Sequence, residues 1–402
     1  MSVNENIFSF IRDDYQRDNF DSFLKKVAFK YDVPTIHIAG TNGKTIVATL
    51  LNNVYRHANY KTGLFISSPN KDVSEMIFVN GNSVSLNEVE TIFNENQKLF
   101  KKFDLSHFEI ITFIALSIFK KENVDIAFIE CGMGGEVDAT NVFNPILSVI
   151  TNVSIEHTDY LGVSLSEIAL HKSGIIKKEV PLVIGDIDGD ALDVIVDVAK
   201  RKLSKVVRIG KEHKVEFSDE GIAFDYKTYE RLFVSNMSKT NIRNACLAID
   251  VVDLLNDKYP VDLDSLKEGL KEKLPIGRFE YRVGKPSLLF DSAHNPEAIK
   301  KLREDVDALL LNKNIYIIFA SFTDKNITAM LPEIALLGKL TLTTFDHPRA
   351  RKEDDYFLYL DEYNFREDYL ELVKDIEAVD PESLIIFTGS TAFVDLVRKQ
   401  IK

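Results

Sequence analysis

A glycine-rich loop that carries a lysine and a threonine follows the first apolar run of the chain. It reads Gly40-Thr-Asn-Gly-Lys-Thr45 and comes directly after the β-branched run at residues 34–39. At a turn from a strand into a helix, backbone N–H groups and the helix dipole bind anions. Lys44 would balance charge on the outer phosphates of a nucleotide, and the Thr45 hydroxyl would reach Mg²⁺. The alternative is an ordinary glycine turn, because Ile38 stands where the common phosphate-binding motif has its first glycine.

Two further polar residues follow apolar runs and could act together with this loop. Glu130 comes directly after one run, and His157 lies a few residues beyond the next. In an open α/β sheet, ligands bind outside the carboxyl ends of the strands. We therefore expect Glu130 and His157 at the same edge as Lys44 and Thr45, where a carboxylate and a hydroxyl suit Mg²⁺. Each also has an ordinary alternative, because a single histidine is more often structural and a carboxylate at a strand end is more often solvated.

The elements that must position these residues alternate between strands and helices. Apolar, β-branched runs predict buried strands, and amphipathic stretches predict helices. The strands are expected at residues 34–39, 124–129 and 145–150, and the helices at residues 45–57 and 108–121. This alternation is typical of a mostly parallel sheet with helices on both faces. Residues 206–234 differ, because their short alternating runs and turn residues predict antiparallel strands, and a helix is expected at 241–255.

A domain boundary is predicted near residues 275–286, which contain two glycines and two prolines. Beyond it the alternation of strands and helices resumes. The strands are expected at residues 288–290, 315–319, 340–344 and 384–387. We therefore predict an α/β fold of two domains. The N-terminal domain, residues 1–283, would be of the P-loop type with a mostly parallel sheet, and residues 284–402 would form a smaller, Rossmann-like domain.

The overall composition excludes several classes of protein. The 402 residues include 49 Lys and Arg against 62 Asp and Glu, a net charge of −13, which argues against a protein that coats nucleic acid. A hydrophobic share of 45% is enough to build a core, and no apolar run is long enough for a membrane span. No secretory signal is visible, and two cysteines suit a reducing compartment. We therefore expect a cytoplasmic protein without nucleic-acid or membrane partners.

Eight short motifs, in order along residues 36–398, resemble those of the folylpolyglutamate synthase/dihydrofolate synthase branch of the Mur ligase superfamily. The phosphate loop is the first, and Glu130-Cys-Gly-Met-Gly-Gly-Glu-Val-Asp-Ala-Thr-Asn141 is the longest. The other six are Leu64-Phe-Ile-Ser-Ser-Pro69, Ile168-Ala-Leu-His-Lys-Ser-Gly-Ile-Ile-Lys177, Gly277-Arg-Phe-Glu280, Asp291-Ser-Ala-His-Asn-Pro296, Ser321-Phe-Thr-Asp-Lys325 and Thr388-Gly-Ser390. One such motif is weak evidence, whereas eight in register are strong evidence.

The resemblance implies an ATP-dependent amide ligase whose C-terminal domain is the glutamate-ligase domain. Such an enzyme transfers the γ-phosphoryl group of ATP to the carboxylate of a (tetrahydro)folate or dihydropteroate, and the amine of L-glutamate then attacks the acyl phosphate. ADP and phosphate are released, and a monomer is the expected state. The small-molecule partners would therefore be ATP, L-glutamate and a folate or pteroate.

Residue roles also follow from the resemblance. Ser68 and Glu130 would bind one Mg²⁺, and His157 would help to bind a second. Lys172 would be carbamylated, which requires a neutral amine and hence burial; the alternative is a surface or salt-bridged lysine. The residues implied in ATP binding are Thr41, Asn42, Gly43, Lys44, Thr45, Asn244, Arg278, Asp291 and His294. Those implied in catalysis are Lys44, Lys172, His157 and Arg278.

Several positions depart from the pattern of this branch. Asn70, Met76 and Glu136 replace its usual His, Arg and Arg, and His171 and Ser173 flank Lys172 in place of Glu and Ala. Two other readings therefore stay open: a paralogue that ligates an amino acid to a non-folate carboxylate, and a non-catalytic nucleotide-binding module. The kept metal and ATP residues argue against the non-catalytic module.

Overall fold

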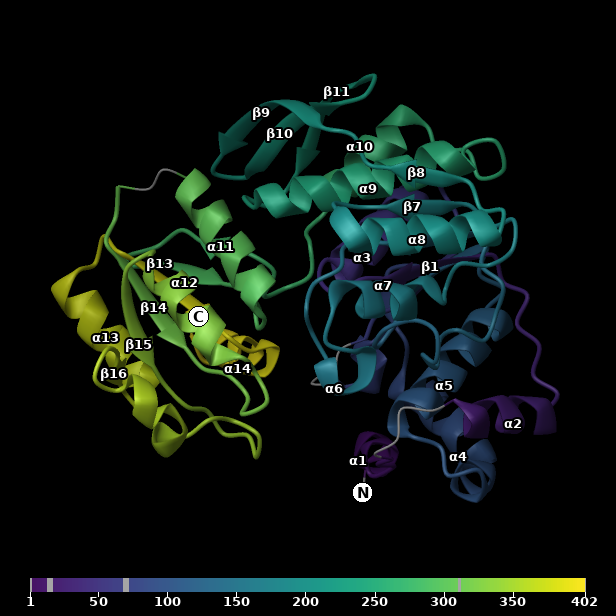
Figure 1. The fold of residues 1–402 in the computed structure, drawn as a ribbon, viewed down its shortest axis with the longest axis horizontal. Coiled ribbons are helices and arrows are strands. Elements are labelled where there is room, and N and C mark those ends of the chain that lie inside the picture. The colour runs from purple at the N-terminus through teal and green to yellow at the C-terminus, as the bar shows by residue number, and fades with distance from the viewer. Residues whose placement is uncertain (1, 13–16, 68–71, 310–311, 402) are drawn as a thin grey trace. The chain divides into compact units, whose positions relative to one another are not determined.

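The computed structural model describes residues 2–12, 17–67, 72–309 and 312–401, and it contains two compact units (Figure 1). The first unit comprises Met1–His213, Asp225–Phe233 and Arg243–Glu272. The second comprises Lys214–Phe224, Val234–Ile242 and Lys273–Lys402. The main division between the units thus follows Glu272, and two earlier short segments, residues 214–224 and 234–242, also belong to the second unit. The domain limits at residues 283 and 284 stay a prediction.

An eight-stranded sheet forms the centre of the first unit, in the order β4-β3-β2-β5-β1-β6-β7-β8. Its strands are β1 (Thr35–Ala39), β2 (Thr62–Phe65), β3 (Ile77–Val79), β4 (Asn82–Ser83), β5 (Ile126–Glu130), β6 (Leu147–Ile150), β7 (Leu182–Ile184) and β8 (Val206–Arg208). Strands β2, β5, β1, β6, β7 and β8 are parallel to one another, and β3 and β4 extend the sheet beyond β2 in antiparallel fashion. The predicted parallel sheet is confirmed, but residues 206–208 were wrongly assigned, because β8 pairs parallel to β7.

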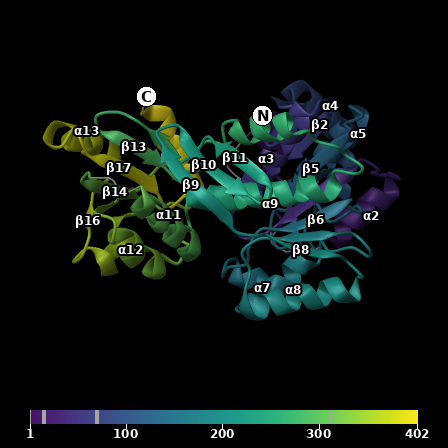
Figure 2. The same cartoon turned by 90° about the horizontal axis from the view of Figure 1, so that it is seen from above.

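Helices cover both faces of this sheet because its central strands are buried along their whole length. The helices are α1 (Val3–Phe8), α2 (Asp18–Lys26), α3 (Lys44–His57), α4 (Leu86–Lys102), α5 (His107–Lys121), α6 (Thr158–Leu161), α7 (Leu165–Ser173), α8 (Gly189–Arg201), α9 (Lys239–Leu255) and α10 (Leu263–Lys271), with a 3₁₀ turn at Val73–Glu75. Figure 2 shows α7 and α8 on the side of the sheet opposite α9. The predicted helices after β1 and before β5 are therefore confirmed.

A small sheet precedes α9 and consists of β9 (Glu212–Ser218), β10 (Gly221–Tyr226) and β11 (Tyr229–Val234), in the order β11-β10-β9. Two residues join each pair of consecutive strands, a connection length that only antiparallel hairpins allow. This part of the prediction for residues 206–234 is correct.

The second unit contains a six-stranded sheet in the order β12-β13-β17-β14-β15-β16. The strands are β12 (Glu280–Arg282), β13 (Ser287–Phe290), β14 (Ile315–Phe319), β15 (Lys339–Leu342), β16 (Asn364–Phe365) and β17 (Leu384–Thr388). All pairs are parallel except that of β12 with β13. The helices are α11 (Pro296–Ala308), α12 (Ile327–Ala335), α13 (Tyr369–Val379) and α14 (Thr391–Gln400), with a 3₁₀ stretch at Glu353–Tyr359. The predicted Rossmann-like arrangement is confirmed.

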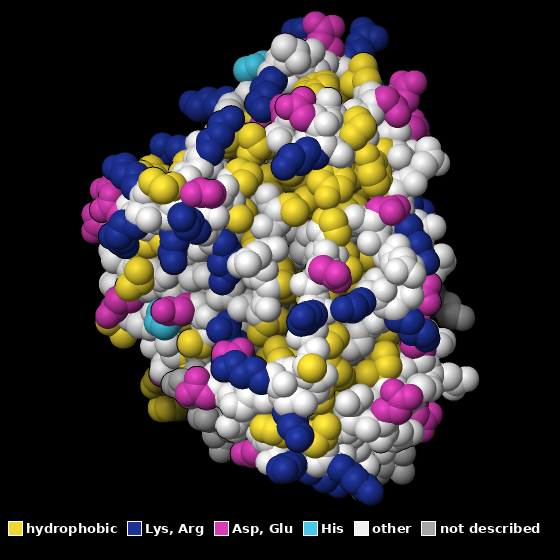
Figure 3. All heavy atoms as spheres, turned by 90° about the vertical axis from the view of Figure 1, so that its right-hand side faces the viewer, with side chains coloured by type: hydrophobic (Ala, Val, Ile, Leu, Met, Phe, Trp, Pro, Cys, Tyr) yellow, Lys and Arg dark blue, Asp and Glu magenta, His cyan; other side chains and the backbone are white. Residues whose placement is uncertain are grey.

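Charged side chains are mixed on the surface despite the net charge of −13. On the face shown in Figure 3, Lys and Arg are interspersed with Asp and Glu. Among the described helices, none combines the length and the apolar character that a membrane crossing requires.

Candidate active site

The phosphate loop (residues 40–45) connects β1 to α3, and its two glycines are required by its surroundings. Gly40 has a φ of 148°, and a Cβ atom there would lie 1.8 Å from Thr151 Oγ1. Gly43 has a φ of 81°, and a Cβ atom there would lie 2.5 Å from Asn244 Oδ1. A side chain at either position would therefore push the loop out of place. The structure places Asn244 of α9 against the loop, whereas the contact of Asn244 with ATP that the resemblance implied stays a prediction.

Side chains that follow β6 hold the phosphate loop in shape. Asn152 Oδ1 accepts hydrogen bonds from the backbone N–H groups of Thr41, at 3.1 Å, and Asn42, at 2.8 Å. Thr151 Oγ1 donates to the Asn42 carbonyl at 2.6 Å. Lys44 Nζ donates to two loop carbonyls at 3.0 and 3.2 Å, so it is folded over the loop and would exchange these carbonyls for phosphate oxygens. Sequence reasoning did not identify Thr151 or Asn152.

The Glu130 carboxylate lies at the end of β5, beside the first turn of α3. Thr45 Oγ1 donates to both of its oxygens, at 2.9 and 3.2 Å, and Ser67 Oγ donates to Oε1 at 3.0 Å. The expected convergence of Thr45 and Glu130 is confirmed. Ser68 lies outside the described residues, while Ser67, its neighbour in the same motif, was missed.

This cluster offers the hard oxygen donors that Mg²⁺ prefers. Mg²⁺ is commonly held by one or two carboxylates, with phosphate oxygens and water completing its shell. The described residues contain no group of three His, Cys, Asp or Glu side chains arranged to hold a metal. A site of one carboxylate, two hydroxyls and a nucleotide phosphate fits the chemistry of Mg²⁺ and not that of a closed protein-only site.

Lys172 lies near the end of α7 and is only 3% exposed. Burial and, to a smaller extent, the charge of Lys44 lower its pKa to about 7, while the charge of Glu156 partly opposes them. The expected burial of Lys172 is confirmed. At such a pKa a large share of the amine is neutral near pH 7, and only the neutral amine reacts with CO₂.

The end of α7 is clamped against the segment that follows β5. The Glu136 N–H donates to the His171 carbonyl at 2.9 Å. Asn141 Nδ2 donates to the carbonyls of Glu136, at 2.9 Å, and Gly174, at 3.2 Å. A Cβ atom on Gly174 would lie 2.3 Å from the Glu136 Cα atom, so the two segments touch through their backbones. These contacts fix the turn that follows Lys172.

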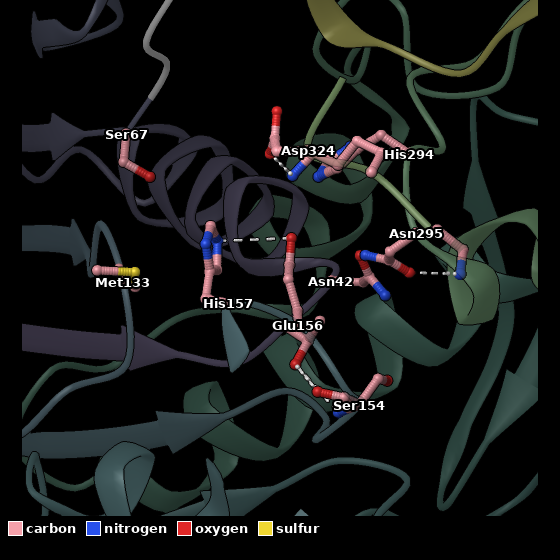
Figure 4. Close-up of polar contacts among 12 residues, drawn as sticks. Asn42, Ser67, Met133, Ser154, Glu156, His157, His294, Asn295 and Asp324 are labelled. Carbon is pink, nitrogen blue, oxygen red and sulfur yellow. Dashed lines mark hydrogen bonds and ion pairs between the residues drawn. The ribbon is translucent and has the colours of Figure 1, made fainter. Parts of the chain in front are cut away.

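His157 lies between β6 and α6 in a left-handed conformation, with a φ of 52°. Its ring is 40% exposed, and Nε2 lies 3.6 Å from Glu156 Oε1 (Figure 4). Glu156 was missed by sequence reasoning, because a carboxylate in a loop gives no signal of its own. Beside a cation this pair could supply a nitrogen and an oxygen ligand.

In the second unit, Arg278 belongs to a loop of its own, residues 277–280, termed the Arg278 loop. Asp291, just after β13, accepts hydrogen bonds from the N–H groups of Phe279, at 2.8 Å, and Ala293, at 2.9 Å. Burial raises the pKa of Asp291, and the charge of Arg278 counteracts this effect. The structure therefore brings Asp291 close to Arg278.

His294 follows Asp291 in the same motif. Its Nδ1 lies 2.8 Å from the Ser292 carbonyl, which can only accept, so Nδ1 carries the proton. Asn295, the next residue, caps α11 through its side-chain oxygen, which accepts from Ala298 N–H at 2.8 Å.

Two buried hydroxyls mark the carboxyl edge of the sheet in the second unit. Ser321 lies just beyond β14 and Ser390 just beyond β17, and these two strands are parallel neighbours. Ser321 is 1% exposed and Ser390 is 2% exposed, and within the described residues neither hydroxyl oxygen has a hydrogen-bond partner. Buried polar atoms in native proteins are usually paired, so this edge has free capacity for a ligand. Both serines lie within motifs noted in the sequence, but neither was singled out.

Comparison with known proteins agrees with this geometry. Residues 38–252 match the model of the Mur ligase middle domain, and residues 277–391 match that of the Mur ligase glutamate ligase domain. The dihydrofolate synthase/folylpolyglutamate synthase of Bacillus subtilis is 30% identical over 391 residues, covering 92% of this chain and 91% of that protein. The folylpolyglutamate synthase of Lacticaseibacillus casei is 28% identical, covering 91% and 89%. Among solved structures, Mycobacterium tuberculosis folylpolyglutamate synthase complexed with ADP is 25% identical, with a TM-score of 0.91 over 99% of this chain and 97% of that one.

Proposed function

The chain belongs to the Mur ligase family, in its dihydrofolate synthase/folylpolyglutamate synthase group, and we propose that it joins L-glutamate to a folate or dihydropteroate carboxylate at the expense of ATP. The single observation that carries this proposal is the cluster of Thr45, Ser67 and Glu130 beside the phosphate loop. It combines an anion-binding turn with oxygen ligands for a cation, and phosphoryl transfer requires both.

The reaction has two steps. In the first, an oxygen of the acceptor carboxylate attacks the γ-phosphorus of ATP, the bond to the β–γ bridging oxygen breaks, and ADP leaves. In the second, the glutamate amine attacks the carbonyl carbon of the acyl phosphate, a C–N bond forms, the amine loses a proton and phosphate leaves. Lys44 and the loop N–H groups would bind the phosphates and stabilise the charge that develops during transfer.

Magnesium would be held by Glu130, with Ser68 as a further ligand and His157 at a second site. When bound, Mg²⁺ neutralises charge on the transferred phosphoryl group. Thr45 and Ser67 would orient the Glu130 carboxylate, to which both donate hydrogen bonds.

Lys172 is proposed to carry CO₂ as a carbamate, which replaces a cationic amine with anionic oxygens close to Lys44. Its burial and the clamped end of α7 support this role, since both hold the amine at a fixed place out of water. Addition of carbamate mass to Lys172 in intact-protein spectra, or a ¹³C signal after incubation with ¹³CO₂, tests the modification directly.

The second unit would supply the remaining groups. Arg278, Asp291 and His294 are proposed to contact ATP, with the guanidinium pairing to phosphate oxygens in the planar geometry that arginine favours. Ser321 and Ser390 are proposed to bind the carboxylates of the incoming glutamate, because their buried hydroxyls are free to donate.

A panel assay tests the proposed reaction. The purified protein is mixed with ATP, Mg²⁺, L-glutamate and a series of pteroates and folates, and phosphate release and product mass are followed. Turnover with dihydropteroate, a reduced folate or both is expected, and Lys44→Ala should abolish it. Turnover only with a carboxylate that carries no pterin would instead establish the non-folate paralogue. Intact ATP turnover in Lys44→Ala would overturn the mechanism.

One observation favours keeping the non-folate acceptor as a second candidate. Glu136 stands at a position where the branch usually has arginine, and its Oε2 lies 3.7 Å from His171 Nδ1. This change of charge lies in the same motif as Glu130, six residues further along the chain, so it alters the electrostatic field of that segment. We also infer a cytoplasmic location, with which the two free, buried cysteines agree, and, from the family resemblance alone, a monomer.

A further inference from the structure

Asn236, between β11 and α9, has all four positions of its side-chain amide occupied. Nδ2 donates to the carbonyls of Arg278, at 2.9 Å, and Phe279, at 3.1 Å. Oδ1 accepts from Ser238 N–H, at 2.9 Å, and from Asn241 Nδ2, at 2.8 Å. The side chain is buried, so water does not replace these bonds if they are lost. Such a fully paired amide can hold two pieces of backbone in one relative position.

The backbone that Asn236 contacts is strained. Phe279 is 2% exposed and has a φ of 54°, a left-handed conformation that a bulky residue rarely adopts. Its carbonyl is bound by Asn236 and its N–H by Asp291. Strained residues persist when the surrounding contacts over-determine them, and these hydrogen bonds hold the two peptide groups that flank the Phe279 Cα atom. Arg278 directly precedes Phe279, so the hydrogen bonds to these two carbonyls also fix the backbone from which the Arg278 side chain extends.

The same amide fixes the beginning of α9. Ser238 Oγ accepts from Asn241 N–H at 3.2 Å and donates to Asp305 Oδ2 at 2.5 Å. Asp305 Oδ1 accepts from Thr240 N–H at 3.2 Å. These contacts satisfy N–H groups that the first turn of a helix leaves without partners. Asn244, which lies against Gly43, is one turn further along α9.

From these contacts we infer that Asn236 is a positioning residue for phosphoryl transfer. It holds the carbonyls of Arg278 and of the strained Phe279 in place and ties them to the first turn of α9. The inference rests on the role proposed for Arg278, and nothing in the sequence motifs points to Asn236. Loss of its two donor bonds releases the Arg278 loop, so the guanidinium reaches the phosphates in a smaller fraction of the molecules.

The test compares Asn236→Ala with Asn236→Asp in the full-length enzyme. The aspartate keeps the acceptor oxygens that serve Ser238 and Asn241 but has no N–H for the two carbonyls. Both variants are expected to lower kcat about 10- to 100-fold while the KM for glutamate changes less than about threefold. Wild-type kcat in Asn236→Asp would overturn the inference, because that variant lacks the donor bonds on which it depends.

A double-mutant cycle with Arg278→Lys separates positioning from a general structural role. If Asn236 acts through Arg278, then Asn236→Ala lowers kcat far less when it is added to Arg278→Lys than when it is made in the wild type. Full additivity would overturn the inference and leave the role of Arg278 intact. Wild-type kcat in Arg278→Lys would instead overturn the role proposed for Arg278, and the inference with it.

Asn326→Ala serves as the matched control. Asn326 is also an asparagine of the second unit, and its side-chain oxygen accepts from Ala329 N–H at 3.3 Å to cap α12. This variant is expected to lower the melting temperature without changing kcat. A kcat loss in Asn326→Ala equal to that of Asn236→Ala would show that destabilisation alone explains both, and would overturn the inference.

Discussion

Two loops, one in each compact unit, keep their shape by opposite means. The phosphate loop depends on missing side chains, because neighbouring atoms occupy the space that a Cβ atom of Gly40 or Gly43 would need. The Arg278 loop contains the bulky Phe279 in a left-handed conformation and depends on hydrogen bonds from Asn236 and to Asp291. The first loop is shaped by space and the second by polar contacts. Glycines in a sequence indicate a loop that is shaped by space, whereas the distant hydrogen bonds that hold the second loop leave no local signal.

The largest effect is expected from Gly40→Ala, which attacks the loop that is shaped by space. A Cβ atom 1.8 Å from Thr151 Oγ1 must displace the turn, and several anion-binding N–H groups move with it. We expect kcat/KM for ATP to fall about 1,000-fold, the scale of losing preorganised donors in phosphoryl and acyl transfer. Calorimetric titration with ADP should show weakened nucleotide binding as well.

Gly189→Ala is the control for this change. Gly189 also has a positive φ, of 60°, but no atom lies within 4 Å of the position of its Cβ atom. Gly189→Ala therefore introduces a side chain at a positive φ without a steric clash, and its ATP turnover should stay within about twofold of wild type. An equal loss of activity in both variants would show that the phosphate loop is not shaped by space.

A smaller loss is expected from Lys172→Ala, which removes a buried amine beside the phosphate loop. The pKa of about 7 leaves roughly nine-tenths of this amine neutral at pH 8, against under about 1% for a lysine of ordinary pKa. We expect an activity loss of about 100-fold, partly restored by acetate, since acetate supplies the oxygen ligands of a carbamate. The exposed Lys178 provides the control, and Lys178→Ala should behave as wild type in the same phosphate-release assay.

The two loops also explain how much could be predicted from the sequence. The parallel sheets, their helices and the meeting of Thr45 with Glu130 followed from apolar periodicity and from the rule that ligands bind at carboxyl strand ends. β8 was assigned wrongly, because three residues are too short to show whether a strand joins a parallel or an antiparallel neighbour. Asn236 was missed for a different reason: the two carbonyls to which it donates lie 42 and 43 residues away in the sequence.

An intermediate effect is expected from Gly277→Ala, at the start of the Arg278 loop. Gly277 has a φ of 70°, but the nearest atoms to a Cβ there, Val394 Cγ1 at 3.1 Å and Ser292 Oγ at 3.2 Å, belong to side chains that need to move only slightly. We therefore expect a lower melting temperature and a loss of kcat of about tenfold. A loss as large as that of Gly40→Ala would mean that both loops are shaped by space, and the contrast between them would fail.

The smallest effect is expected from Asp305→Asn, which tests the polar support beneath the Arg278 loop. Burial raises the pKa of Asp305 to about 6, although Ser238 and Thr240 donate hydrogen bonds to it, and the charge of Asp291 adds to the increase. Because the folded state holds this proton more tightly than the unfolded chain, Asp305 makes the protein less stable as the pH rises from about 4 to about 6. The asparagine has no charge to bury, so its free energy of unfolding should lack this part of the pH dependence.

The difference in the free energy of unfolding between Asp305→Asn and wild type should therefore change by about 2 kcal/mol between pH 4 and pH 7.5. The variant becomes more stable relative to wild type as the pH rises. Melting temperatures measured across this range would detect the change, and kcat at pH 7.5 should stay within about twofold. Asp307→Asn, on the same helix but at an exposed aspartate paired with Arg303, should follow the wild-type pH profile. If Asp305→Asn also followed the wild-type pH profile, ionised Asp305 would not destabilise the folded protein. The Arg278 loop would then depend on Asn236 and Asp291 alone.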